Sequence, residues 1–210
     1  MIGYFRAFTW LTYGNAIFGI SGMASALCGH PSMAMICLIC AGVCDMFDGS
    51  VAKRTKRSDA EKIYGMQIDS FCDLLSFGML PAIVGISLGF QSKLEFALCI
   101  FYVMAALIRL AYFNVTEIQN FYTKGGARTH YEGLPVTTVA AILPLLYLLC
   151  VSFDWSLVAL YRIALGVIAI LFVSRLKVRK PKMREMVIFG VLGIPAIVLL
   201  IHFMGLRGAQ

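Results

Sequence analysis

Four aspartates stand in two closely spaced pairs, Asp45 with Asp48 and Asp69 with Asp73, and each pair adjoins a strongly apolar run. Residues three or four positions apart lie on one face of a helix, so each pair can present its carboxylates together. A charge in such apolar surroundings is costly and usually has a function. Carboxylate oxygens are the ligands that Mg²⁺ and Mn²⁺ require, and a bound cation offsets the repulsion between clustered acids. The two pairs therefore predict a divalent-cation site.

Small residues continue the helix faces that carry the acids. Gly49 and Ala52 extend the face of the first pair, and Gly65 lies one helical turn before Asp69. Because these residues have almost no side chain, a bulky ligand can lie against the backbone there. Lys53 adds a positive charge that suits phosphate. The stretch is therefore typical of phosphate chemistry on a large ligand.

This stretch resembles the CDP-alcohol phosphatidyltransferase family, whose signature reads D-x-x-D-G-x-x-A-R, a spacer, and then G-x-x-x-D-x-x-x-D. The matching positions are Asp45, Asp48, Gly49, Ala52, Lys53, Gly65, Asp69 and Asp73. Lys53 stands where the family has an arginine, and it offers a point charge in place of a two-pronged clamp. The spacer before Gly65 is longer than usual, and we expect the extra residues in a polar loop.

The resemblance implies the transfer of a phosphatidyl group from CDP-diacylglycerol to an alcohol, with release of CMP. It also implies two Mg²⁺ or Mn²⁺ ions on the four aspartates, where they grip the pyrophosphate and stabilise the leaving CMP. Asp73 would in addition be the base that accepts the proton of the attacking hydroxyl. Gly49, Ala52, Lys53 and Gly65 would bind CDP-diacylglycerol.

Polar residues also occur in the first apolar run, FTWLTYGNAIFG, which contains Thr9, Thr12 and Asn15. Small and polar residues of this kind commonly pack and form hydrogen bonds between membrane helices. The resemblance implies instead that Asn15 lies near the cytidine and belongs to the CDP-diacylglycerol site. The sequence leaves both interpretations open.

Three longer runs, DSFCDLLSFGMLP, RLAYFN and EGLPV, are similar to those of the bacterial and archaeal phosphatidylserine synthases within this family. The similarity implies L-serine as the acceptor. Ser76, Arg109 and Asn114 are the candidate acceptor-binding residues, a modest polar set that suits a zwitterion. Ser76 can alternatively bond back to its own helix. Lys124 and Arg128 leave glycerol 3-phosphate and inositol phosphate open as acceptors, because a dianionic phosphate needs a basic cluster.

The composition is that of a membrane protein. Hydrophobic residues make up 60% of the 210 residues, and the mean hydropathy is +0.83, which excludes an ordinary soluble domain. We expect one membrane-embedded domain over residues 1–210, in contact with membrane lipids. The formal net charge is +7. The basic residues cluster between apolar runs, as in cytoplasmic loops, and do not indicate a nucleic-acid partner.

Apolar runs of about 20 residues predict transmembrane helices. They cover residues 8–28, 33–53, 66–88, 95–114, 134–151, 156–174 and 186–204. The predicted fold is therefore all-α, a polytopic transmembrane bundle of about seven spans, one more than the six-helix core that the family resemblance implies. Lysine and arginine gather in the loops after the second, fourth and sixth spans, which predicts that the acids face the cytoplasm from the cell membrane.

Two other functions compete with the enzyme. Intramembrane acids also mark cation transporters, but transporter sites usually lie near the bilayer midplane, whereas Asp48 is only five residues from Lys53. Such a shallow site favours an enzyme with cytoplasmic substrates. A non-catalytic lipid scaffold would not need the complete set of acids. Arg162, in the outer half of the sixth span, is expected to pack or to reach the interface, and a homodimer is left open.

Overall fold

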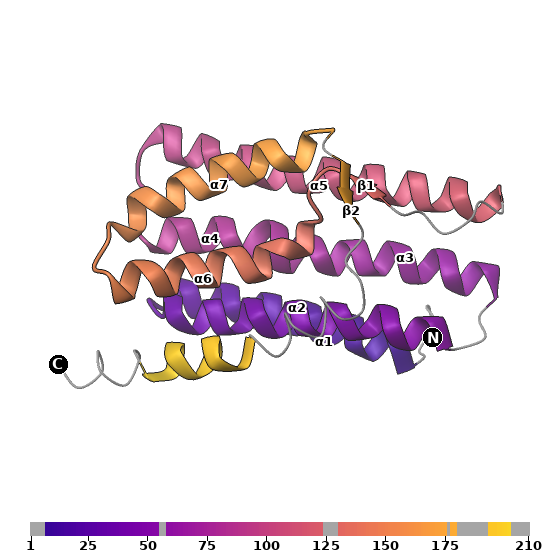
Figure 1. The fold of residues 1–210 in the computed structure, drawn as a ribbon, viewed down its shortest axis with the longest axis horizontal. Coiled ribbons are helices and arrows are strands. Elements are labelled where there is room, and N and C mark those ends of the chain that lie inside the picture. The colour runs from indigo at the N-terminus through magenta and orange to yellow at the C-terminus, as the bar shows by residue number, and fades with distance from the viewer. Residues whose placement is uncertain (1–6, 55–57, 124–129, 176, 180–192, 203–210) are drawn as a thin grey trace.

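The computed structural model describes residues 7–54, 58–123, 130–175, 177–179 and 193–202. Their helices pack side by side as an elongated bundle that carries one short two-stranded sheet (Figure 1). The predicted all-α membrane bundle is confirmed. The sheet is an addition that the sequence did not indicate, because each strand is only three residues long.

The elements follow one another along the chain with short connections. They are α1 (Ala7–Leu27), α2 (Pro31–Arg54), α3 (Asp59–Asp73), η1 (Leu74–Met79), α4 (Leu80–Ser87), α5 (Lys93–Tyr122), β1 (His130–Glu132), η2 (Val136–Thr138), α6 (Val139–Ser152), α7 (Leu157–Val173) and β2 (Lys177–Arg179). A further helix covers Gly193–His202. Each predicted span therefore overlaps a helical segment, although several helices are longer or shorter than predicted, and of the span 186–204 only 193–202 is described.

Helices α3, η1 and α4 form a continuous rod from Asp59 to Ser87 that is almost as long as α5. Figure 1 shows α1 and α2 side by side along one edge of the bundle, next to this rod, while α5 runs back along it. Helices α6 and α7 cover the half of the bundle near α4. The end of α2, the start of α3 and the end of α5 lie together at one end of the bundle, and the α4–α5 and α6–α7 turns lie at the other.

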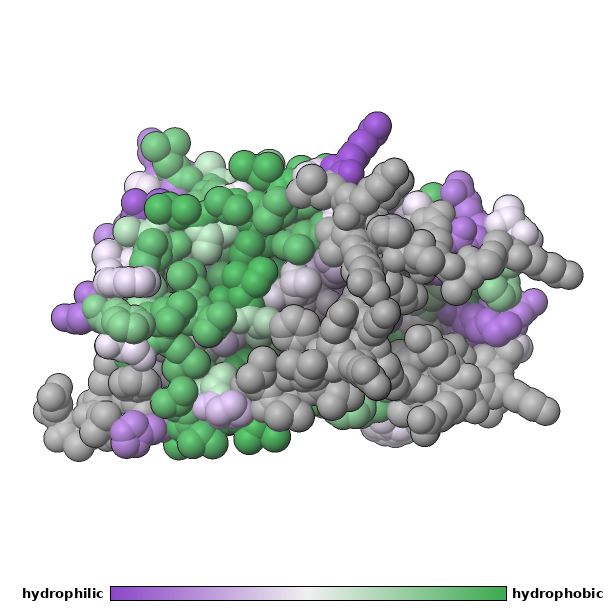
Figure 2. All heavy atoms as spheres, in the orientation of Figure 1, coloured by the Kyte–Doolittle hydropathy of each residue, from purple (hydrophilic) through white to green (hydrophobic). Residues whose placement is uncertain are grey.

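Within the described residues, three helical segments are long and apolar enough to cross a membrane: Pro31–Asp48, Asp59–Ser87 and Lys93–Tyr122. Val136–Ser152, Leu157–Val173 and Gly193–His202 are apolar but shorter. In Figure 2, hydrophobic side chains gather over the part of the visible face that holds α6 and α7, and hydrophilic ones lie toward both ends of the bundle. This distribution fits a bundle with lipid around its apolar part.

Helix α3 begins earlier than predicted. Ser58 is its N-cap: the Ser58 hydroxyl accepts the backbone N–H of Glu61, and the Glu61 carboxylate accepts the backbone N–H of Ser58. This reciprocal cap satisfies two donors that a helix start leaves unpaired. The spacer before Gly65 is therefore helical from Asp59 onward, so the expectation that it forms a polar loop was wrong for that part.

The rod changes its winding directly after Asp73, because η1 is a π-helix. Pro81 follows, and since proline has no N–H it cannot donate to the carbonyl of Phe77 one turn earlier. The buried Tyr102 of α5 donates its hydroxyl to that carbonyl at 2.7 Å. Tyr161 of α7 donates to the carbonyl of Pro81 at 3.0 Å. Neighbouring helices thus stabilise the rod where its own hydrogen bonding is irregular.

The core is formed by buried side chains of α1, α2, the rod, α5, α6 and α7. Its enclosed side chains include Phe77, Leu80, Leu143 and Phe172. Apolar burial alone does not hold helices together in lipid, so close packing matters more than in water. Glycines of α1 permit that packing: a Cβ added at Gly22 would lie 2.8 Å from the Leu80 side chain.

The short sheet joins two loops that are distant in sequence. Strand β1 precedes α6 and strand β2 follows α7, and the two are antiparallel, with His130 opposite Arg179 and Glu132 opposite Lys177. The loop before α6 is thereby tied to the segment after α7.

Candidate active site

The two aspartate pairs meet between α2, which carries Asp45 and Asp48, and α3, which carries Asp69 and Asp73. Carboxylate oxygens of Asp45, Asp48 and Asp69 lie within 4.8 Å of one another. Asp73 lies one turn after Asp69 on α3 and accepts a hydrogen bond from Asn15. Asp48 and Asp73 are buried, whereas Asp45 and Asp69 are partly exposed. The structure therefore brings Asp45, Asp48 and Asp69 together, and the roles of the four acids stay predictions.

One oxygen of this cluster lacks a partner. Oδ1 of Asp69 is buried and accepts no hydrogen bond within the part of the chain that the structure describes. A buried acceptor without a partner is costly, and clustered carboxylates repel one another. A hard divalent cation with oxygen ligands relieves both effects. The donor set therefore fits Mg²⁺ or Mn²⁺, and the four aspartates are the residues that would hold it.

Helix α1 brings two further polar side chains to the acids. Oγ1 of Thr12 donates to Oδ2 of Asp48 at 3.0 Å, and Nδ2 of Asn15 donates to Oδ1 of Asp73 at 2.8 Å. Both side chains are buried. The sequence did not reveal that Thr12 contacts an acid. The available signal was the three-residue spacing of Thr12 and Asn15, which puts both on one face of an otherwise apolar helix.

The structure describes only some of the residues predicted to bind CDP-diacylglycerol. Helix α2 extends through Gly49, Ala52 and Lys53, but their side chains lie outside the described residues. Gly65 is buried on α3, one turn before Asp69. The backbone register thus agrees with the signature, while the roles of these residues stay predictions.

Two acceptor candidates are tied to neighbouring helices. Ser76 donates its hydroxyl to the backbone carbonyl of Asn15 at 2.9 Å, and not to its own helix. Asn114 accepts, through Oδ1, a hydrogen bond from Ser70 at 2.8 Å. These contacts join η1 to α1 and α5 to α3. The binding of the acceptor alcohol by Ser76 and Asn114 stays a prediction.

Arg109, the third acceptor candidate, contacts the loop before α6. Its Nε donates to the carbonyl of Leu134 at 3.1 Å, and its Nη2 to the carbonyl of Gly133 at 3.5 Å. Gly133 has a φ of +80°, and a Cβ there would lie 3.0 Å from the carbonyl oxygens of Phe172 and Ser174. Glycine is therefore required at this position. Arg109 connects α5 to this loop and, through it, to the end of α7.

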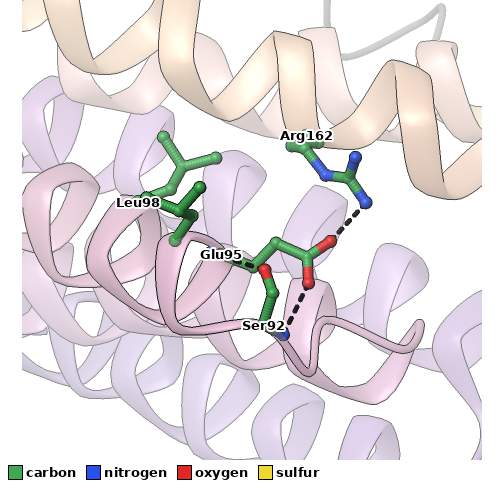
Figure 3. Close-up of a pocket in the computed structure, with 5 residues that line it drawn as sticks. Ser92, Glu95, Leu98 and Arg162 are labelled. Carbon is green, nitrogen blue, oxygen red and sulfur yellow. Dashed lines mark hydrogen bonds and ion pairs between the residues drawn. The ribbon is translucent and has the colours of Figure 1, made fainter.

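A separate open cavity of about 570 Å³ lies at the start of α5, at the end of the bundle opposite to the start of α3 (Figure 1). It is lined by Ser92, Leu94, Glu95, Leu98 and Arg162. Figure 3 shows Arg162 of α7 and Glu95 of α5 pointing toward each other, and they form an ion pair. Glu95 also accepts the backbone N–H of Ser92 at 2.8 Å. We interpret this cluster as a helix cap and an ion pair that join α7 to the start of α5. The ion pair with Glu95 accounts for the charged Arg162 in an apolar helix.

Comparison with known proteins agrees with this geometry. Residues 8–174 match the CDP-alcohol phosphatidyltransferase family. The chain is 39% identical over 109 residues to the CDP-diacylglycerol–serine O-phosphatidyltransferase of Saccharomyces cerevisiae, a match that covers 50% of this chain and 38% of that protein. It is 30% identical over 135 residues to the archaetidylserine synthase of Methanothermobacter thermautotrophicus, which covers 64% of this chain and 54% of that protein.

A third similar protein is the CDP-diacylglycerol–serine O-phosphatidyltransferase of Bacillus subtilis, with 27% identity over 115 residues, 51% of this chain and 60% of that protein. The chain therefore spans about half the length of the curated relatives that it matches.

Proposed function

The chain belongs to the CDP-alcohol phosphatidyltransferase family, and on this basis we propose that it transfers a phosphatidyl group from CDP-diacylglycerol to L-serine, which yields phosphatidylserine and CMP. The observation that carries the chemistry is the convergence of Asp45, Asp48 and Asp69, whose carboxylate oxygens lie within 4.8 Å of one another. The choice of serine is supported by the relatives that are named for serine transfer and by the runs around Ser76 and Arg109.

In the proposed reaction, the serine hydroxyl oxygen attacks the phosphorus atom of the phosphatidyl group. A new oxygen–phosphorus bond forms, the bond from phosphorus to the CMP oxygen breaks, and CMP leaves with the bonding electrons. Asp73 accepts the hydroxyl proton; it is buried, and Asn15 holds its Oδ1. The four aspartates would hold the two divalent cations, whose positive charge would stabilise the pyrophosphate and the leaving CMP.

The other residues in this proposal bind and orient the two substrates. Lys53 supplies a point charge for the phosphates, and the small residues Gly49, Ala52 and Gly65 let the ligand lie close to the helix backbones. Arg109 pairs with the serine carboxylate, and Ser76 and Asn114 offer polar atoms to the zwitterion. The site faces the cytoplasm, where the soluble acceptor arrives, while the acyl chains stay in the lipid.

The proposal is tested by giving purified protein an equal mixture of L-serine, glycerol 3-phosphate and inositol phosphate, with labelled CDP-diacylglycerol and Mn²⁺. The lipid product is identified by mass, and phosphatidylserine should dominate. L-Alanine alone is the matched control, because it is the same zwitterion without the hydroxyl, and it should give no transfer product. Phosphatidylglycerophosphate as the main product would leave the chemistry intact and refute serine as the acceptor. Absence of CMP release with every acceptor would refute the enzyme itself.

A further inference from the structure

We propose that Thr12 and Asn15 of α1 are positioning residues for the acids: each donates a hydrogen bond to one carboxylate and so orients the oxygens that hold the divalent cation. This inference rests on the proposed function, because the cation belongs to it. It goes beyond that function because it assigns the orientation of the metal-binding carboxylates to α1, in addition to any contact of α1 with the nucleotide.

The first observation is the pair of hydrogen bonds. Thr12 reaches Oδ2 of Asp48 at 3.0 Å, and Asn15 reaches Oδ1 of Asp73 at 2.8 Å. The donors are only 3% and 0% exposed. Asp48 belongs to α2 and Asp73 to α3, so one face of α1 holds one acid from each of the two helices that form the cluster.

The second observation is that the position of Asn15 is itself held in place. Ser76 donates its hydroxyl to the backbone carbonyl of Asn15 at 2.9 Å. Gly19, one turn further along α1, permits this close contact, because a Cβ there would lie 3.0 Å from Cα of Ser76. Ser76 lies in η1, the π-helix that begins directly after Asp73. The register of α1 against the rod is therefore set within one turn of the acid that Asn15 contacts.

The physical consequence concerns the two oxygens of each carboxylate. A carboxylate can turn about its last bond and offers acceptor sites on both oxygens. A buried donor to one oxygen limits that rotation and leaves the other oxygen in a defined direction. Partners of this kind, which act on the residues that bind a metal, typically change its affinity by about 10–100-fold when removed. Oδ1 of Asn15 is buried without a partner among the described residues, so the amide also keeps an acceptor for a substrate.

The test measures Mn²⁺ binding to the substrate-free protein in detergent, from the electron paramagnetic resonance signal of free Mn²⁺. Thr12→Val keeps the shape of the side chain but removes its donor, and Asn15→Leu does the same for the amide. Each should weaken Mn²⁺ binding by about 10-fold or more. Thr12→Ser keeps the hydroxyl and should restore binding to within about threefold of the unmodified protein.

The matched control is Tyr161→Phe. It also removes a buried hydroxyl that bonds between helices, at 3.0 Å to the carbonyl of Pro81, but Tyr161 has no contact with the acids in the described structure. It should lower the unfolding temperature without changing Mn²⁺ affinity. Equal loss of affinity in Tyr161→Phe and Thr12→Val would overturn the inference, because general loosening of the bundle would then explain both.

Unchanged Mn²⁺ affinity in both Thr12→Val and Asn15→Leu would also overturn it, whatever happens to the rate. The proposed function fails separately, if the unmodified protein binds Mn²⁺ but releases no CMP from CDP-diacylglycerol. In that case the Mn²⁺ affinities of the variants still test whether Thr12 and Asn15 position the acids. An unmodified protein that binds no Mn²⁺ would refute both.

Discussion

The aspartates of the cluster have different surroundings although they share one side-chain type. Asp48 and Asp73 are buried and accept hydrogen bonds from α1. Asp69 keeps a buried oxygen that no described residue pairs with. Since an unpaired buried acceptor is costly, Asp69 is the acid for which a bound cation brings the largest relief.

Asp69→Asn should therefore lower the rate of CMP release by on the order of 10²-fold or more, because charge stabilisation worth several kcal/mol would depend on the bound ion. The rate is measured with saturating Mn²⁺. Asp59→Asn is the control: Asp59 lies on the same helix but is exposed and pairs with Lys62 at 3.1 Å, so its variant should keep the rate. Full activity of the unmodified protein in excess EDTA would contradict the requirement for a metal.

Asp73→Asn tests the proposed base. The amide keeps nearly the same shape but cannot accept the hydroxyl proton, so the rate should fall by on the order of 10²-fold or more. Binding of CDP-diacylglycerol, measured by equilibrium dialysis of the labelled lipid in detergent, should stay measurable. A parallel loss of binding and rate would assign Asp73 to metal or substrate binding alone.

Among the elements, the rod of α3, η1 and α4 combines the site with the core. Its first part carries Asp69 and Asp73, and its last part packs against α1, α5 and α7. The π-helix and Pro81 interrupt the regular hydrogen bonding between these parts. Side chains from other helices replace the missing hydrogen bonds. The stability of the rod therefore depends on tertiary contacts more than the stability of a regular helix does.

Tyr102→Phe should lower the free energy of unfolding by about 1–3 kcal/mol, since the buried carbonyl of Phe77 loses the hydroxyl that donates to it at 2.7 Å. In a Pro81→Ala background the same substitution should cost less, because the alanine introduced there supplies an N–H to that carbonyl. Denaturation of the four proteins in one detergent gives the coupling. Tyr122→Phe, at the exposed end of the same helix, is the control. Equal costs in both backgrounds would show that Tyr102 does not compensate for the proline.

On the visible face of the described residues, an apolar surface over α6 and α7 lies between ends that carry hydrophilic side chains (Figure 2). Basic residues of the sequence concentrate around the junction of α2 and α3 and in the segment after α7. The sheet of β1 and β2 ties the loop before α6 to the segment after α7. Because lysine and arginine are biased toward the cytoplasmic side, we predict that the end of the bundle that holds the start of α3 faces the cytoplasm.

Sealed membrane vesicles test this orientation. L-Serine is charged and does not cross the bilayer readily, so inside-out vesicles given external serine should release CMP into the medium. Right-side-out vesicles should do so only after permeabilisation with detergent, which serves as the control for equal amounts of enzyme. Equal rates in both intact preparations, or the reverse order, would contradict the predicted orientation.

The sequence by itself determined the parts that depend on local geometry. Helical periodicity pairs Asp45 with Asp48 and Asp69 with Asp73 on single faces, since residues three or four apart always meet on a helix. The length of the apolar runs predicts the helical bundle for the same reason, because each span is read from its own residues. The local sequence also contains the signal for the start of α3, because Ser58 and Glu61 form its capping box. A loop was nevertheless expected there.

Only the tertiary structure decided which helix faces meet. Thr12 contacts Asp48, Arg162 pairs with Glu95, and Tyr102 reaches the carbonyl of Phe77. Each contact joins residues far apart in the chain, and it depends on how each helix is rotated and shifted against its neighbour. That rotation is set by the packing of whole side-chain surfaces, including the glycine contact of α1 with Ser76. The periodicity of a single helix does not contain this information.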